Sequence, residues 1–134
     1  MRVLVVTNMY PSRERPWLGP FVRDQVEAFR RREDLEVELF AFGPGPRALV
    51  RAGIELRRRY GPPAPRFDIV HAHFGLTAWP ALLARLGPVV VTLHGNDLLV
   101  RRSYVVTRAA LPFTALPAAV SRAFSDNLPE RQVV

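Results

Sequence analysis

Short apolar runs alternate with segments of helical hydrophobic spacing along the whole chain of 134 residues. The first run, Arg2 to Thr7, is almost continuously aliphatic, which is typical of a strand buried on both faces of a parallel sheet. Further strands are expected at Leu35–Phe42, Phe67–His73, Val89–Leu93 and Ala115–Val120, and a helical pattern separates each from the next. This alternation predicts a doubly wound α/β domain of about five to six parallel strands, with helices on both faces.

Proline, glycine and serine mark where the helices between these strands begin and end. The run from Leu35 starts with alternating apolar and acidic residues, as a strand near a sheet edge does. The chain's last residues resemble the first half of a further strand. Helices are expected from Pro20 to Arg32, Arg47 to Tyr60, Leu76 to Leu86 with Pro80 in its first turn, 98 to 111, and from an N-cap at Ser121 to about Leu128.

The composition describes an ordered but strongly basic protein. Hydrophobic residues make up 49% of the chain, the formal net charge is +7, and all 19 basic residues are arginine. The clusters are Arg30–Arg32, Arg57–Arg59 and Arg101–Arg102. Two of them fall near the C-terminal ends of expected helices, where cations complement the helix dipole. The charge is typical either of a solvated surface or of attraction to phosphate in a nucleotide, a lipid head group or a nucleic acid.

Several protein classes do not fit the sequence. The chain has no cysteine, which excludes disulfides, thiolate metal clusters and a cysteine nucleophile. The first apolar run is too short for a signal peptide, and the weakly polar stretch Ala109–Val120 is well short of the roughly 20 residues that span a bilayer. A cytoplasmic protein is expected.

Polar residues and glycines gather where the expected strands end. The long loop Asn8–Pro20 follows the first strand, His73-Phe74-Gly75 the third, His94-Gly95-Asn96-Asp97 the fourth, and Ser121-Arg122 the fifth. Open α/β sheets bind ligands outside the carboxyl ends of their strands. One crevice is therefore expected to collect all four segments.

The loop after the first strand lacks both glycine-rich phosphate motifs. Neither Gly-x-Gly-x-x-Gly nor the P-loop pattern occurs there, which argues against a dinucleotide site and a P-loop NTPase. Gly19 and Pro20 directly precede a helix, whose free N–H groups and dipole suit a diphosphate oxygen. They serve equally well to start the helix.

The three histidines fall on or next to two strands. His71 and His73 alternate on one strand and share a face, and His94 ends a later strand. Together with Asp97 they resemble a metal ligand set, but no further carboxylate cluster supports it, and no metal is expected. His71 is interpreted as a core histidine, whereas His73 and His94 lie beside glycines and are favoured as site residues.

Five segments in register resemble the N-terminal domain of family 4 glycosyltransferases, and together they cover essentially the whole chain. The segments are Met1–Ser12, Gly19–Gln25, Phe67–Gly75, Val91–Asp97 and Ala119–Ser121. The resemblance implies a Rossmann-like domain of a two-domain (GT-B) enzyme. That enzyme would transfer a sugar, with retention of configuration and without a metal or other cofactor, from a nucleotide-diphospho-sugar co-substrate to an acceptor.

The resemblance also implies roles for individual residues. His94 matches the histidine that contacts the donor sugar near the reacting centre, and Asp97 lies in the matching loop. Gly19 matches the loop that approaches the donor phosphates and the acceptor, and His73 and Gly75 match the segment lining the acceptor cleft. The catalytic residues expected are His94 and Asp97, and the donor- or acceptor-binding residues are Gly19, Pro20, His73, Gly75, Gly95, Asn96, Ser121 and Arg122.

By the same resemblance, residues 1–134 form the acceptor-side domain, and the nucleotide-sugar-binding domain is absent from this chain. The expected partners are the donor, a glycan, lipid or small-molecule acceptor and the missing domain, with peripheral contact to the inner face of the membrane and no nucleic acid. We expect the chain alone to fold without transferring sugar. The alternatives are a basic module that docks on anionic membrane or phosphate ligands, and an excised or engineered folding fragment without activity.

Overall fold

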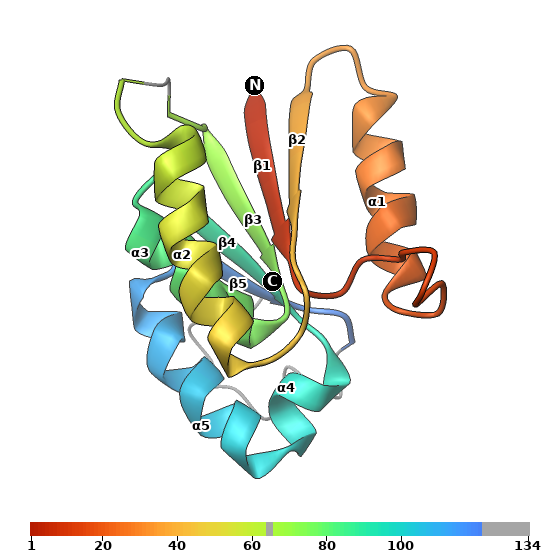
Figure 1. The fold of residues 1–134 in the computed structure, drawn as a ribbon, viewed down its shortest axis with the longest axis vertical. Coiled ribbons are helices and arrows are strands. Elements are labelled where there is room, and N and C mark those ends of the chain that lie inside the picture. The colour runs from red at the N-terminus through yellow and green to blue at the C-terminus, as the bar shows by residue number, and fades with distance from the viewer. Residues whose placement is uncertain (64–65, 122–134) are drawn as a thin grey trace.

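The computed structural model describes residues 1–63 and 66–121 and contains a five-stranded parallel sheet with the strand order β2-β1-β3-β4-β5 (Figure 1). This confirms the predicted α/β class. The strands are β1 Arg2–Thr7, β2 Glu36–Ala41, β3 Ile69–His73, β4 Val89–Leu93 and β5 Leu116–Ala119. The helices are α1 Pro20–Arg30, α2 Pro46–Tyr60, α3 Ala78–Ala84, α4 Gly95–Leu99 and α5 Arg101–Ala110, with 3-10 turns η1 Gly75–Thr77 and η2 Leu111–Phe113.

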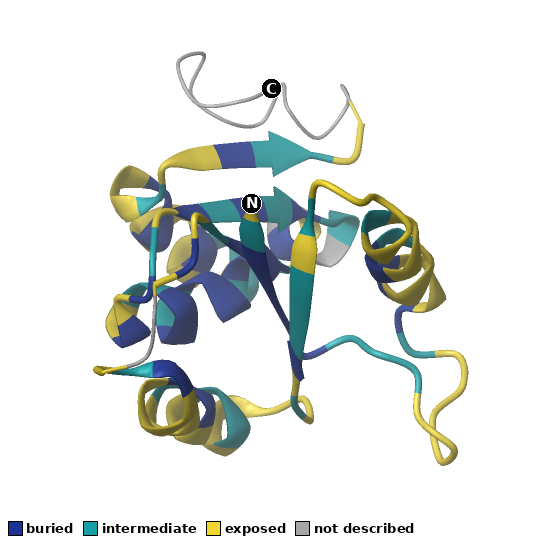
Figure 2. Ribbon diagram, turned by 90° about the horizontal axis from the view of Figure 1, so that it is seen from above, coloured by how far each residue is buried: buried dark blue, intermediate teal, exposed yellow. Residues whose placement is uncertain are grey.

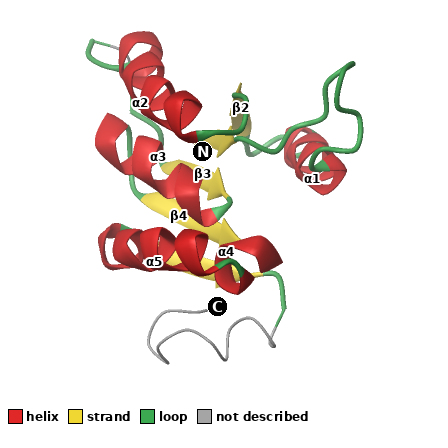
Figure 3. Ribbon diagram, turned by 60° about the horizontal axis from the view of Figure 1, so that its bottom comes forward, coloured by secondary structure: helices red, strands yellow, loops and turns green. Residues whose placement is uncertain are grey.

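The strand order reverses between β1 and β3. The chain first moves outward from β1 to β2, then crosses back over β1 to β3 and continues through β4 to β5. Right-handed crossovers therefore place α1 on one face of the sheet and α2, α3 and α5 on the other (Figure 3). The carboxyl ends of β1 and β3 form the switch point at which this fold binds ligands.

Two apolar cores lie on the two faces of the sheet. Leu4 and Val6 of β1 belong to the larger core, which β1 shares with β3, β4, α2 and α3. Val3 and Val5 point the other way and pack against α1 in the smaller core. All four side chains are at most 4% exposed, which explains the continuous aliphatic run at the start of the chain (Figure 2).

The expected edge strand and second helix are both confirmed. β2 lies at the edge of the sheet, and its outward-facing Glu36 forms an ion pair of 3.3 Å with Arg2 of β1. Helix α2 follows directly on Gly45 and buries Leu56 and Tyr60 against the larger core.

The structure differs from the sequence-based prediction in the segments that follow β3 and β4. The helix expected at 76–86 is a 3-10 turn followed by α3, although Pro80 does lie in the first turn of α3. The helix expected at 98–111 is divided into α4 and α5 by Val100, whose backbone is extended at φ −91° and ψ 110°. The predicted helix starting at Ser121 and the strand at its end fall outside the described residues.

Candidate functional site

His73 and His94 meet at the carboxyl edge of the sheet, as their positions at the ends of β3 and β4 predict. Their rings stack with centroids 5.6 Å apart, and Nδ1 of His73 lies 3.4 Å from Nε2 of His94. Phe21, in the first turn of α1, contacts the His94 ring at a centroid distance of 4.8 Å. The first turn of α1 thus packs against His94, a half-buried side chain at the edge of the switch point.

His71 lies deeper on the same face of β3. Its ring centroid is 4.3 Å from that of His73, and its Nε2 is 2.8 Å from Oγ1 of Thr92 on β4. The Phe29 ring of α1 covers it at 6.2 Å. The prediction of a buried, hydrogen-bonded core histidine is confirmed.

Burial keeps the three histidines neutral at neutral pH. It lowers the pKa of His71 to about 4 and that of His73 to about 3, and it also lowers the pKa of His94. A neutral imidazole carries one N–H donor and one acceptor nitrogen. The contact between His73 and His94 can therefore be one N–H···N hydrogen bond, which leaves Nδ1 of His94 for another partner.

Asp97 joins the segments that follow β3 and β4. Its Oδ1 accepts a hydrogen bond of 2.8 Å from the N–H of Gly75, and its Oδ2 accepts one of 2.6 Å from the N–H of His94. The side chain is fully buried. Burial raises the pKa of Asp97 to about 7, against the opposing effect of the two N–H donors. Both oxygens are occupied by backbone groups, so the geometry suits positioning of Gly75 and His94 rather than contact with a substrate.

Gly19 is held tightly by the loop that follows β1. Its backbone is left-handed, at φ 63° and ψ 46°, and a Cβ atom at this position would lie 2.3 Å from the carbonyl oxygen of Met9. Pro20 begins α1 and is exposed. The helix has no side-chain cap and no acidic residue in its first turn, so no side chain of that turn compensates the positive end of its dipole.

The remaining predicted site residues lie near the same edge where the structure describes them. Gly75 is buried against Thr107 of α5, and Gly95 begins α4. Asn96 lies in the first turn of α4. Ser121 is exposed just beyond β5, where the N–H of the preceding residue bonds to the carbonyl of Leu93. Arg122 falls outside the described residues.

Three buried polar atoms lie around this edge. His73 was expected there and Asn8 only as the start of the loop after β1, whereas Thr107 was not expected. Asn8 Oδ1, His73 Nε2 and Thr107 Oγ1 are buried in the described part of the chain without a hydrogen-bond partner. Asn8 follows β1 directly, and Thr7 is paired with His73 in the sheet. For Asn8, the signal available in the sequence was a polar residue immediately after a buried strand. Buried polar atoms without a partner are costly, and a bound ligand commonly satisfies them.

The described residues contain neither a set of three or more His, Asp or Glu side chains arranged to hold a metal ion nor a helix long and apolar enough to cross a bilayer.

A doubly wound sheet with polar groups gathered at its switch point defines a class of ligand-binding α/β domains. Over residues 2–133 the sequence matches the family model described as Glycosyltransferase Family 4. The chain therefore belongs to glycosyltransferase family 4, as the five segments predicted. No curated protein matches it.

The pH dependence of stability should report the buried histidines. Below pH 6.5 the unfolded chain protonates His71 and His73 while the folded chain does not, so their stabilising contribution is lost as the pH falls from 6.5 toward 4 and 3. Asp97 has the opposite effect on the free energy of unfolding. Its raised pKa stabilises the folded chain at low pH, and this stabilisation is lost as the pH rises from 3.8 through about 7. The lowered pKa of His94 adds to the effect of His71 and His73, so three histidines oppose Asp97, and the free energy of unfolding should fall on acidification by at least roughly 1.4 kcal/mol per pH unit near pH 5.

Urea unfolding between pH 7.5 and 4.5 measures this slope. The free energy of unfolding should fall on acidification, and His71→Gln should reduce the slope by roughly 1.4 kcal/mol per pH unit, because it removes one titrating histidine. A wild-type unfolding midpoint that stays constant from pH 6.5 to 4.5 would contradict neutral burial of these rings.

Proposed function

We propose that this chain is the acceptor-side half of a retaining glycosyltransferase, which transfers a sugar from a nucleoside diphosphate sugar to a glycan, lipid or small-molecule acceptor. The observation that carries the proposal is the cluster of His73, His94 and Asp97 at the carboxyl ends of β3 and β4, beside the switch point of a family 4 domain. Ligands of doubly wound sheets bind at that edge.

His94 is the residue that we assign to the reacting centre. Its ring is oriented by His73 on β3 and by Phe21 on α1, and its backbone N–H is held by Asp97. In our proposal the neutral imidazole contacts the donor sugar as its bond to the diphosphate breaks. The acceptor hydroxyl then bonds to the same carbon on the same face, and its proton goes to the departing phosphate oxygen. Asp97 is a positioning residue in this scheme and not a nucleophile.

The remaining edge residues bind the two substrates in this proposal. Gly19 and Pro20 present the N-terminal end of α1, whose dipole favours the developing charge on the diphosphate. His73 and Gly75 line the acceptor side. We also assign substrate binding to Gly95, Asn96 and Ser121, and to Arg122, which falls outside the described residues. The donor is a co-substrate, and no resident cofactor is required.

A second domain is needed to hold the nucleotide in this scheme. We propose that residues 1–134 fold alone and acquire transfer activity when joined to a nucleotide-sugar-binding domain. Calorimetry with uridine, guanosine and adenosine diphosphate sugars, together with turnover assays, should be done on this chain and on the joined protein. Tight donor binding and turnover are expected for the joined protein only. Turnover of a nucleotide sugar by purified residues 1–134 would refute the proposal that transfer requires both domains.

Docking on anionic membrane is a second candidate function, favoured by the surface of α4 and α5. Leu99 is 71% exposed and Val105 60% exposed, and the exposed Arg101 and Arg102 lie between them in sequence. Apolar side chains beside cations are typical of interfacial helices. Sedimentation with anionic vesicles should be strong at low salt and weak at high salt, because screening reduces the electrostatic part. If the chain sedimented equally with neutral and with anionic vesicles, electrostatic docking on membranes would be contradicted.

A further inference from the structure

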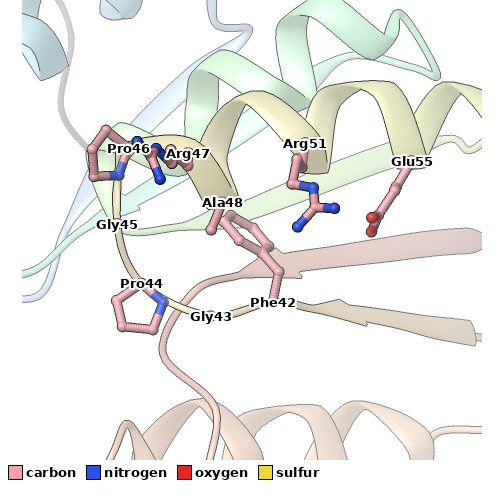
Figure 4. Close-up of a pocket in the computed structure, with 9 residues that line it drawn as sticks. All are labelled: Phe42, Gly43, Pro44, Gly45, Pro46, Arg47, Ala48, Arg51 and Glu55. Carbon is pink, nitrogen blue, oxygen red and sulfur yellow. The ribbon is translucent and has the colours of Figure 1, made fainter.

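A groove beside β2 has no role in the proposed transfer step. It lies between α2 and the loop that joins β2 to α2, and its volume of about 580 Å³ is in the range of small-molecule sites (Figure 4). The loop starts directly after β2, so the groove opens at the same carboxyl edge of the sheet as His94. Its lining comprises Phe42, Gly43, Pro44, Gly45, Pro46, Arg47, Ala48, Arg51 and Glu55.

Two arginines give the groove its charge. Arg47 and Arg51 are one turn apart on α2, so their side chains lie on the same side of the helix, and both line the groove. Neither forms an ion pair within the described part of the chain. Glu55, one turn further along, is the acidic member of the lining and projects beside Arg51 (Figure 4). The excess positive charge therefore lies toward the beginning of α2.

The loop and the helix end add to this site. Gly45 has φ 117° and ψ 156°, a conformation essentially restricted to glycine, which turns the chain sharply into α2. Helix α2 begins at Pro46 without a side-chain cap or an acidic first turn, so the dipole has the same sign as the two arginines. The half-buried Phe42 ring supplies an apolar wall next to these charges.

The position of the groove indicates what part of a ligand would reach it. β2 and β4 are separated by β1 and β3, which makes three strand spacings or roughly 14 Å along the sheet. The groove also lies on the α2 face of the sheet, whereas the His94 ring packs against α1 on the other face. A reacting hydroxyl near His94 would therefore belong to a different part of the ligand from the group in the groove. Guanidinium groups match phosphate oxygens by paired hydrogen bonds, and two arginines match its charge.

We propose that this groove binds a phosphate group of the acceptor through Arg47 and Arg51, at a distance from the hydroxyl that receives the sugar. The inference rests on the proposed function and narrows its acceptor to a phosphorylated compound. A soluble sugar phosphate and a phosphorylated lipid offer the same chemistry.

Titration of this chain with inorganic phosphate, followed by backbone amide chemical shifts, tests the groove directly. We expect saturable shifts at Gly45, Arg47 and Arg51. The double variant Arg47→Ala with Arg51→Ala should weaken binding at least tenfold. Glu55→Gln should tighten it by about twofold, the size of an exposed charge interaction.

The matched control is Arg57→Ala with Arg58→Ala, which removes the same charge from the far end of α2 and should change the affinity by less than twofold. Equal weakening by both double variants, or no saturable shifts in the groove, would overturn the inference. Neither result affects donor binding and turnover by the joined protein, which test the proposed function independently of the groove.

Two further arms identify the source of the phosphate. If a hexose phosphate competes with inorganic phosphate and phosphatidic acid vesicles do not, the acceptor is a soluble compound. If the vesicles compete and the hexose phosphate does not, the acceptor is a lipid. Failure of both ligands to compete would count against an acceptor site.

Discussion

Replacing Asp97 by alanine should destabilise the domain by about 3 kcal/mol, because two buried N–H groups lose their acceptor and each unsatisfied group costs roughly 1–3 kcal/mol. Asp97→Asn should fall between wild type and alanine. Its amide keeps one acceptor oxygen but turns an NH2 group toward one of the two N–H donors. Urea unfolding gives the stability of each variant.

The same substitutions should reduce turnover in the joined protein. Asp97 holds the backbone of both His94 and Gly75, and a misplacement of about 1 Å at a reacting group costs on the order of 100-fold in rate. The loss should appear in kcat more than in KM. Asp24→Asn is the matched control, because Asp24 is exposed and, in the described part of the chain, its side chain pairs with the preceding residue, Arg23. Asp97 would lose its assigned role if Asp97→Ala were as stable and active as Asp24→Asn.

Gly19→Ala should also have a large effect, through backbone conformation and through space. A left-handed conformation costs a non-glycine residue about 1–2 kcal/mol, and the added Cβ would overlap the Met9 carbonyl oxygen at 2.3 Å. We expect a total loss of roughly 3 kcal/mol, in the range that steric overlap in a packed loop produces. Movement of α1 should also displace Phe21 from His94 and so weaken activity.

Gly43→Ala provides the comparison for Gly19→Ala. A Cβ atom added at Gly43 would meet no atom within 4 Å, and the φ of this residue is not positive, so its substitution should leave the unfolding midpoint nearly unchanged. Equal midpoints for the two variants would show that the Met9 contact and the left-handed backbone impose no constraint. Amide cross-peaks of Phe21 and His94 report separately whether α1 has moved.

The sheet could be predicted from the sequence because its signals are local. The aliphatic run of β1 reflects burial on both faces, and the alternation at the start of β2 reflects the packing of Val37 and Leu39 against the smaller core while Glu36 and Glu38 face the other way. The neighbourhood of His73 and His94 followed from topology, since both stand at the ends of strands that lie side by side. No side-chain detail was needed for either prediction.

The arrangement around Asp97 could not be predicted in the same way. Its carboxylate turns inward because it bonds to Gly75, which is 22 residues away, and no local pattern records that contact. The N–H of Asp97 also bonds to the carbonyl of His94, and α4 begins at Gly95. The segment after His94 is therefore helical where a loop was expected. The packing of Phe21 on His94 also depends on how α1 approaches the sheet edge. These features arise from tertiary contacts and not from periodicity.

The role of His94 can be measured by turnover of the His94→Ala variant, in a protein that joins residues 1–134 to a nucleotide-sugar-binding domain. We expect a fall in kcat of about 100-fold or more, the size typical for loss of one group that stabilises a transition state. The unfolding midpoint should stay close to that of the exposed control Arg57→Ala, which should retain full activity. A folded His94→Ala variant that turns over donor at the rate of this control would contradict the assignment of the reacting centre to the carboxyl edge of β4.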